Sequence, residues 1–436
     1  MTKPNELNDR IYEAITDDSG EERSCENIPD EACDVVPGSY LRNTISGVFS
    51  KLAEQLASPG LILPWLLSAT GASSFFAGAL VPIKDAGSLL PQLAVSAKIR
   101  ARSVRKTIWT LSAVIQGISL LLMGVAVYLT EGNTLGWIVL GTLTAFSLAS
   151  GVASVAFKDV LGKTIPKGKR GQLLALRSTL GGILTTAGGF VLYRYVEGTN
   201  NTITYVVLIG SAAVLWFASA LTFYSISEKP GATEGGRSPI KELKQGMALL
   251  KHSPNLQRFI LARALLMAIP FSQPFLVLFG KDIVGSGLDN LGVMVIAAGI
   301  AGIVSSPFWG RFADYSSRKL MIVIGLFGSV LLAAAIAFPK LPETIQTTYL
   351  FAGIIVLQVM AHGGARLSRK TYLVDMAPAK ERPLYVALSN TLIGVSTIFF
   401  VVLGLIADVF SVTIMLWTLS ILSLFSAVVS LGLKEV

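Results

Sequence analysis

Charge is scarce in this sequence. Charged residues make up 14% of the 436-residue chain, whereas apolar residues make up 52%. A soluble chain of this length would form two or three domains, each with a polar surface. Instead, uncharged runs recur at residues 132–157, 290–310 and 344–365, each close to or above the ~20 residues that cross a bilayer as a helix. The composition therefore predicts a membrane protein with many spanning segments.

The motifs of common enzymes and metal sites are also absent. The chain has two cysteines and two histidines, and no cluster of Cys, His and carboxylates has the spacing of a metal site. No Walker loop is present, so we expect no direct use of ATP. Strict apolar–polar alternation is missing, which excludes a transmembrane barrel and leaves helices as the spanning form. We predict an all-α membrane protein that is not an enzyme and binds no cofactor.

The N-terminal region differs from the rest in its acidity. Residues 1–36 hold three basic and eleven acidic side chains, so we expect residues 1–38 to be a disordered cytoplasmic tail and not a signal peptide. Cys25 and Cys33 lie here at a spacing that fits no zinc pattern; a solvated tail and metal or redox sensing are both open. Residues 39–57 have helical apolar spacing, which predicts an amphipathic helix on the membrane surface or the start of the first span.

Twelve spanning helices are predicted, at 58–75, 78–98, 107–129, 135–157, 171–193, 203–225, 257–279, 290–310, 320–338, 347–368, 384–406 and 412–432. The connections on one side, 98–106, 158–170, 227–258, 311–319 and 366–382, hold 24 Lys and Arg residues, and the opposite connections hold three. The positive-inside rule places the basic side and both termini in the cytoplasm, within the cytoplasmic (inner) membrane. The net charge of +9 thus follows from topology, and we expect no nucleic-acid binding.

An internal repeat relates the two halves of the chain. Residues 97–106 correspond to 310–319 at an offset of 213, and 163–182 correspond to 375–394 at an offset of 212. The second pair is identical at Pro166/Pro378, Arg170/Arg382, Ala175/Ala387, Leu176/Leu388, Thr179/Thr391, Leu180/Leu392 and Gly182/Gly394. The repeat predicts two six-helix halves, at 58–226 and 257–436, joined by a cytoplasmic linker at 227–256. This arrangement is typical of alternating-access transporters.

These repeated residues resemble the signature of the major facilitator superfamily. The second half matches it with Gly310, Asp314, Arg318 and Lys319, while the first half has Ala97 and Ala101 for the glycine and aspartate but keeps the basic pair Arg105 and Lys106. The stretches VPIKDAGSLLPQL (81–93) and KDVLGKTIPKGKRG (158–171) are similar to a bacterial subfamily of these permeases. The resemblance implies a two-fold pseudo-symmetric bundle of twelve helices.

The resemblance also implies a cytoplasmic gate around the signature. Asp314 would contact a neighbouring helix end when the protein is open to the outside. Lys158, Asp159 and Arg366 mark the cytoplasmic ends of the fourth and tenth spans, and we include them among the gate residues. Basic residues at these positions are also explained by the positive-inside rule alone.

Lys84 and Asp85 are predicted to lie inside the second span. Two spans must fit between Ser58 and Lys98, so each takes ~20 residues and the turn falls near residues 75–78. A turn at Lys84 and Asp85 would leave only ~18 Å of helix before the basic connection. A charge at that depth costs at least ~2.5–3.5 kcal/mol. We interpret the pair as a cavity site, with Asp85 the candidate proton carrier, or as part of an outer gate; Gln92 could line the same cavity.

Other ionisable and polar groups also lie at membrane depth. Arg177 and Arg263 each lie about two turns into a span, and His362 lies two-thirds along the tenth span. Each either lines a cavity or pairs with a neighbouring helix. His362 is a second candidate for proton coupling because its pKa lies nearest the physiological range. Pro270 and Pro274, on either side of Gln273, should weaken the seventh span and free carbonyl groups.

The embedded basic groups outnumber the embedded acids, because Asp85 is the one clear carboxylate deep in a span. This balance favours a small anionic or zwitterionic organic substrate. We therefore predict a monomeric secondary active transporter that works by rocker-switch alternating access, coupled to protons or another ion. The alternatives are a proton-coupled exporter of drugs or amphiphiles, and a non-transporting membrane receptor or assembly factor with the same fold.

Overall fold

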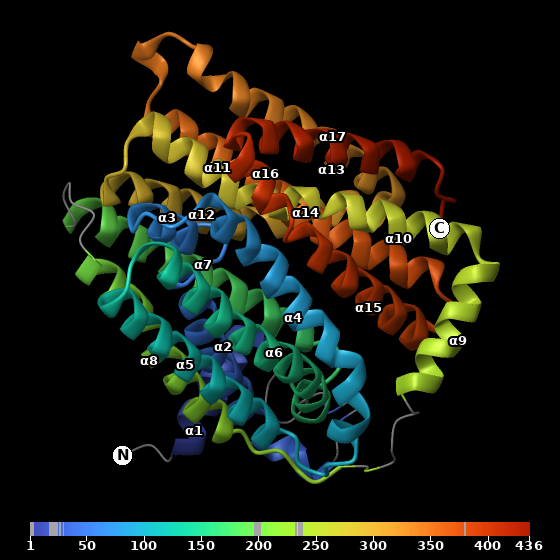
Figure 1. Cartoon of the computed structure of the whole chain (residues 1–436). Helices are drawn as coiled ribbons and strands as arrows, with labels where there is room; N and C mark the ends of the chain where they lie inside the picture. Colours follow the sequence, from blue (N-terminus) through green and yellow to red (C-terminus); the bar gives the residue numbers. More distant parts are fainter. Residues whose placement is uncertain are drawn as a thin grey trace.

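The computed structural model describes residues 4–16, 25, 28, 30–195, 202–231, 233, 239–378 and 381–436. Every regular element in these residues is a helix (Figure 1), which confirms the predicted all-α class. The first half contains α2 (Val36–Leu56), α3 (Ile62–Ala69), α4 (Ser74–Arg100), α5 (Lys106–Leu129), α6 (Gly132–Thr164), α7 (Arg170–Tyr195) and α8 (Thr202–Tyr224). The second half contains α10 (Pro254–Leu266), α11 (Ala268–Val284), α12 (Leu288–Tyr315), α13 (Ser317–Ala337), α14 (Thr348–Met376), α15 (Arg382–Phe400), α16 (Leu403–Val409) and α17 (Val412–Leu431).

Each half is a helical bundle of its own. In the first half α5 packs against α6 and α8, and in the second half α13 packs against α14 and α17. The halves meet where α7 packs on α12 and where α4 packs on α15 and α16 (Figure 1). We call the end of the bundle that carries the Lys- and Arg-rich connections the basic end. The end with the α3–α4 and α16–α17 turns is the opposite end.

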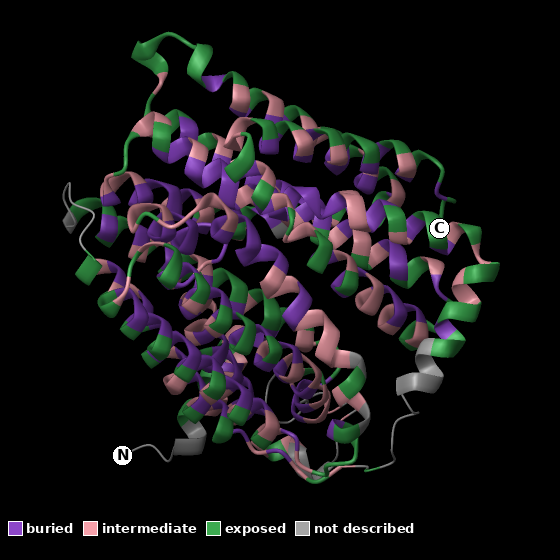
Figure 2. Ribbon diagram, in the orientation of Figure 1, coloured by how far each residue is buried: buried purple, intermediate pink, exposed green. Residues whose placement is uncertain are grey.

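The surface of the bundle is that of a membrane protein. Large apolar side chains such as Leu121, Leu221 and Val330 are exposed on its outer faces, while buried residues gather between the helices (Figure 2). Nine helices, or pairs of helices in line, within the described residues are long and apolar enough to cross a membrane. The more polar helices α2 with α3, α4 and α7 also belong to the bundle, and the count of twelve spans stays a prediction.

Of the two placements that the sequence left open for residues 39–57, the structure agrees with the start of the first span and not with the surface helix. Helix α2 packs along α7 and α8, and its polar residues Asn43 and Ser46 are fully buried there. The Ser46 hydroxyl donates to the carbonyl oxygen of Ser219 on α8 at 3.1 Å. Residues 39–57 therefore belong to the bundle and do not form a helix on its surface. In the sequence, their hydroxyl and amide groups are typical of a helix face exposed to water. In the structure, these groups instead bond to residues on other helices.

The N-terminal region contains a helix where we expected disorder. Helix α1 (Pro4–Thr16) packs on α2 through Tyr12 and Tyr40, both fully buried, with ring centroids 5.2 Å apart. Leu161, Ile165 and Leu173, at the ends of α6 and α7, complete this apolar cluster. A short stretch of large apolar side chains is thus enough to dock an otherwise acidic segment on the bundle.

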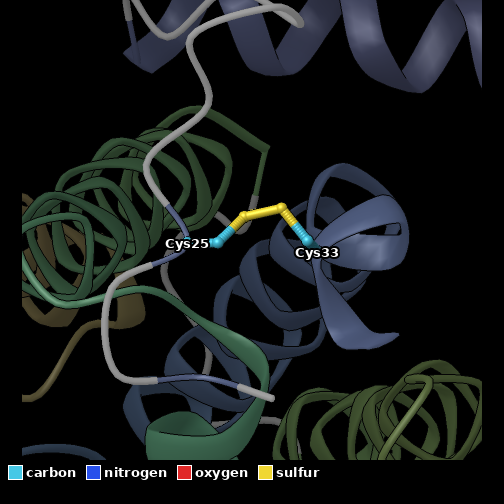
Figure 3. The surroundings of a disulfide bond; sticks show 2 residues. All are labelled: Cys25 and Cys33. Atoms are coloured by element: carbon cyan, nitrogen blue, oxygen red, sulfur yellow. A yellow bond between two sulfur atoms is a disulfide. The ribbon is translucent and has the colours of Figure 1, made fainter. Parts of the chain in front are cut away.

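Cys25 and Cys33 form a disulfide in the N-terminal region (Figure 3). Cys33 lies in the 3₁₀ helix η1 (Asp30–Val35), which contacts α2. Residues 17–24, 26, 27 and 29 of the tail lie outside the described residues. Both sulfur atoms are used in the bond, so the pair is not arranged as metal ligands in this structure.

Four glycines bring the two halves together at α7 and α12. Gly182 faces Gly299 and Gly189 faces Gly292, so each helix contributes two glycines seven residues apart. A Cβ atom on Gly292 would lie 2.5 Å from the backbone nitrogen of Tyr193, and one on Gly299 would lie 2.9 Å from that of Thr186. Small residues permit this close backbone approach in the absence of a strong hydrophobic drive between membrane helices.

We expect Gly292→Ala to loosen the contact between the halves by about 1–3 kcal/mol, because the backbone of α7 has nowhere to move. Thermal unfolding of the purified protein would measure the loss. The matched control is Gly302→Ala on the same helix, where a Cβ would meet nothing within 4 Å. That change should be neutral or stabilising by up to about 1 kcal/mol; equal effects of the two substitutions would contradict close packing as the cause.

Candidate functional site

Lys84 and Asp85 lie inside α4, the eleventh and twelfth of its 27 residues. The structure therefore agrees with their predicted placement within a helix and not in a connection. The charges of Arg369, Lys84 and Arg263 act on Asp85. No salt bridge within 4 Å joins Asp85 to any of these cations in the described part of the chain. Asp85 therefore faces several cations that it does not touch.

Arg263 is buried in the second half, with 6% of its surface exposed. Its Nη1 donates to Ser389 Oγ at 2.5 Å and its Nη2 to Asn390 Oδ1 at 2.9 Å, both on α15. Its Nε has no hydrogen-bond partner. The arginine thus links α10 to α15 through neutral acceptors, and its positive charge is left without a bonded carboxylate.

Arg369 of α14 is a second cation at this place, and the sequence analysis missed it. Its Nη1 lies 2.7 Å from Met267 Sδ, and its Nε has no hydrogen-bond partner. We had assigned residues 366–382 to a connection, but α14 continues to Met376. The absence of a proline or glycine between Arg366 and Met376 is the signal that could have extended the helix.

Arg177 is the corresponding buried arginine of the first half, with 9% of its surface exposed. Its Nη1 donates to Asn43 Oδ1 on α2 at 2.5 Å, and its guanidinium lies 4.6 Å from the Phe157 ring centroid. Gly47 of α2 leaves the space through which the side chain passes. Arg177 therefore also links two helices of its own half through a neutral acceptor.

Glu54 of α2 joins the central charges and was also missed, since we placed it on a surface helix. It forms a salt bridge with Lys51 at 3.0 Å, and the charges of Lys84 and Arg177 also act on it. The charge of Lys84 thus acts on two carboxylates, Glu54 and Asp85. One cation can therefore act as the counter-ion of either carboxylate.

A row of basic side chains follows one face of α14 towards the basic end. His362, Arg366 and Arg369 are four and three residues apart, which is the spacing of one helix face. Arg366 and its neighbour Lys370 are exposed. The charge of Lys158 on α6 acts on Lys370 from the other half. Cations of the two halves are therefore near enough at this end for their charges to act on one another.

Gln92 and Gln273 are less closely tied to this cluster. Gln92 Nε2 donates to the carbonyl oxygen of Ser88 on its own helix at 2.8 Å. Gln273 lies against Gly60, at the break between α2 and α3. The seventh span breaks at Met267, between α10 and α11. The break falls where Pro270 cannot donate a hydrogen bond to the preceding turn.

The gate signature holds each half together at the basic end. Glu228, after α8, accepts hydrogen bonds from the backbone nitrogens of Arg105 and Lys106 and pairs with Lys163 at 2.8 Å. Arg105 also pairs with Asp159 at 3.5 Å. The carboxylate thus caps the start of α5. Its signal in the sequence is an acid just after the last helix of a half.

The second half repeats this contact with Glu435, after α17. Glu435 accepts a hydrogen bond from the Ser316 hydroxyl and pairs with Arg318 at 3.1 Å. The Ser316 hydrogen bond, with the charge of Arg318, lowers the pKa of Glu435. Lys319 lies over the Tyr315 ring, 4.8 Å from its centroid. Asp314 is exposed, and no salt bridge to it is found within the described ranges.

The halves are joined by polar contacts at the opposite end. Asp408 of α16 accepts hydrogen bonds from the Ser73 hydroxyl and, at 3.1 Å, from the backbone nitrogen of Phe75. Lys281 of α11 donates to Ser68 Oγ of α3 at 2.9 Å. A carboxylate of the second half therefore caps the first turn of α4. This cap must break if the halves separate at this end.

Comparison with known proteins agrees with this architecture. The family model of the Major Facilitator Superfamily matches residues 271–435. An uncharacterised Mycobacterium tuberculosis protein is 26% identical over 382 residues, which cover 84% of this chain and 71% of that protein. The multidrug resistance protein MdtG of Salmonella typhi is 26% identical over 252 residues, covering 55% of this chain and 57% of MdtG.

The fold comparison extends over nearly the whole chain. The crystal structure of a D-xylose-proton symporter superposes with a TM-score of 0.67 at 14% identity, covering 91% of this chain and 97% of that chain. At this identity the likeness concerns the fold alone. The fold that the repeat and the signature predicted is thereby confirmed.

We expect Asp408→Ala to shift the protein towards separation of the halves at the opposite end. Loss of a helix cap costs about 0.5–2 kcal/mol, a change of about 2- to 30-fold in the ratio of closed to open molecules. Spin labels at Glu131 and Glu343, both exposed at this end, would report the distance between the halves after Cys25 and Cys33 are replaced by serine.

The control is Ser411→Ala, which removes the cap of α17 within a single half. It should lower stability without changing the label distance. An unchanged distance distribution in Asp408→Ala would show that the cap does not hold the halves together.

Proposed function

We propose that this chain, which has the fold of the major facilitator superfamily and matches its family model over residues 271–435, is a secondary active transporter of that family. In this proposal it moves a small anionic or zwitterionic organic solute by rocker-switch alternating access. The observation that carries the proposal is the group of cations between the halves: Arg263, Arg369 and Lys84 act on one carboxylate, Asp85. Charges inside a membrane bundle are costly and usually belong to a substrate or ion pathway. The protein is a transporter in this reading and not an enzyme.

The contacts between the halves support alternating access. The Asp408 cap lies at the opposite end, and the facing glycines run from the middle of α7 and α12 towards that end. Exposed Arg366 and Lys370 lie on the side of the basic end. With the basic end and both termini in the cytoplasm of a monomer in the inner membrane, this is an inward-facing conformation.

Coupling to protons is the second part of the proposal. Asp85 is a carboxylate inside a span and next to Lys84, so changes in its surroundings during the transport cycle can load or release a proton. The structural relative titled a D-xylose-proton symporter makes a proton the first ion to test. His362, with Arg366, Arg369 and Lys84 acting on it, is the second candidate.

An exporter of drugs or amphiphiles is the alternative function, because MdtG is a multidrug resistance protein. The excess of cations around Asp85 favours the anionic substrate over a cationic drug. Reconstitution of the purified protein in proteoliposomes would test both. Substrate-dependent flux that responds to an imposed proton gradient supports transport, and the direction and charge of the solute decide between the two.

We expect Asp85→Asn to abolish accumulation of substrate against its gradient while sparing exchange at equal concentrations on both sides. Asparagine resembles a permanently protonated aspartate, so it can no longer carry a proton through the cycle. Tracer uptake and counterflow in the same proteoliposomes would separate the two activities. Uphill accumulation by Asp85→Asn would move the coupling role to His362 or Asp159.

We expect Asp314→Asn to slow turnover while leaving equilibrium substrate binding nearly unchanged. Asp314 is exposed at the basic end in this conformation, so the contact expected of it forms only when that end closes. Turnover in proteoliposomes and binding in detergent would be measured on the same preparation. Equal loss of both would indicate a direct role in binding or a folding defect.

A further inference from the structure

Two arginines whose charges act on Asp85 have donors with no acceptor among the described residues. Arg263 uses two of its nitrogens on Ser389 and Asn390, and Arg369 uses one on the weak acceptor Met267 Sδ. The Nε atoms of both arginines are buried and have no hydrogen-bond partner in the described ranges. Buried polar groups are nearly always hydrogen-bonded, and the planar guanidinium matches the two oxygens of a carboxylate or phosphate.

The local charge is also unbalanced. Asp85 is the carboxylate that acts on both Arg263 and Arg369, and no salt bridge within 4 Å joins it to either arginine in the part of the chain described. Glu54 is bonded to Lys51 instead. Two cations with one distant acid leave a net positive charge, which one added anion would neutralise.

The route from the basic end carries the same sign. Lys370 follows Arg369 on the basic-end side of α14, and the charge of Lys158 on α6 acts on Lys370 from the other half. A group of charges of one sign raises the local concentration of the opposite ion. The row therefore attracts anions towards Arg369.

From these observations we propose that Arg263, Arg369 and Asp85 form an oxyanion site, in which the two arginines bind a carboxylate or phosphate group of the substrate and Asp85 competes with that group for them. The proposal rests on the proposed transport function and specifies its substrate class. Arg263 and Arg369 are then specificity-determining residues, and a neutral or cationic solute gains nothing from them.

Competition with Asp85 gives a mechanism for coupling. The charged groups that act on Asp85 are Lys84 on its own helix, Arg263 on α10 and Arg369 on α14. When an oxyanion occupies the arginines, it brings a second negative charge beside Asp85 and takes up its counter-ions. Asp85 then binds a proton, so the anion and one proton are taken up together.

The test is equilibrium binding to the purified full chain in detergent, at constant ionic strength. Inorganic phosphate and succinate are the oxyanion probes, and succinamide is the neutral match for succinate. Titration calorimetry gives the affinity, and an indicator dye gives the protons taken up. We expect succinate or phosphate to bind and succinamide not to, with about one proton taken up per anion and tighter binding at lower pH.

Variants then assign the binding to these residues. Arg263→Gln and Arg369→Gln should each weaken oxyanion binding by at least about tenfold, the loss typical of a charged hydrogen bond. The matched control is Arg258→Gln, an exposed arginine on the same helix as Arg263, which should bind as the unaltered protein does. Asp85→Asn should bind the oxyanion at least about threefold more tightly, without proton uptake or pH dependence.

The tighter binding expected of Asp85→Asn makes the test decisive, because a misfolded variant would not bind the oxyanion more tightly. The site is overturned if neither oxyanion binds better than succinamide, if both glutamine variants bind as Arg258→Gln does, or if Asp85→Asn retains proton uptake. Flux in proteoliposomes is measured separately. Oxyanion binding without flux would remove the transport function and leave the site, whereas flux of a neutral or cationic solute without oxyanion binding would remove the site and leave transport.

Discussion

The structure depends on how it holds guanidinium groups in a medium that disfavours charge. A charged side chain near the centre of a bilayer costs at least ~2.5–3.5 kcal/mol, and a directly bonded carboxylate would be the usual compensation. Arg177 and Arg263 instead donate to amide and hydroxyl oxygens on the next helix. Their hydrogen bonds are partly satisfied, yet their charges are not cancelled. Among the described residues, these two guanidinium groups therefore keep their charge without a bonded carboxylate, as the proposed anion site requires.

The same contacts make each half a stable unit. Arg177 links α7 to α2, and Arg263 links α10 to α15, which are the fifth and first helices of one half and the first and fifth of the other. At the repeat offset of 212, Arg177 corresponds to Ser389, the acceptor of Arg263. Both halves thus have a hydrogen bond between their first and fifth helices, but the arginine lies on the fifth helix in the first half and on the first helix in the second half. A repeat in sequence can thus preserve a helix–helix contact without preserving the residue that carries its charge.

Much of this arrangement could be predicted because it depends on residues that are near one another in the chain. The apolar runs predict most helices, and chain length alone requires Lys84 and Asp85 to lie within α4. The first span could not be placed in this way, because Asn43 and Ser46 are polar and their partners on α7 and α8 are distant in sequence.

Arg369 and Glu54 were missed for related reasons. Hydropathy ends the tenth span near the first arginine, although α14 continues through Arg369 to Met376. Glu54 was missed because a helix on the membrane surface was predicted for residues 39–57. Charged residues look like helix ends in sequence, whereas Arg369 and Glu54 lie within α14 and α2, where charges from other helices act on them. The contacts at the opposite end, such as Asp408 on α4, have no local signature at all.

The distribution of bonds bears on how the halves could move. The ion pairs at the basic end, Glu228 with Lys163 and Glu435 with Arg318, lie within single halves, so none of them has to break when the halves separate there. Across that end, Lys158 and Lys370 repel one another. Closure of the basic end brings cations of both halves together and is opposed while the site is empty. An oxyanion bound as proposed would remove part of that repulsion, so loading of the site would itself favour closure around the substrate.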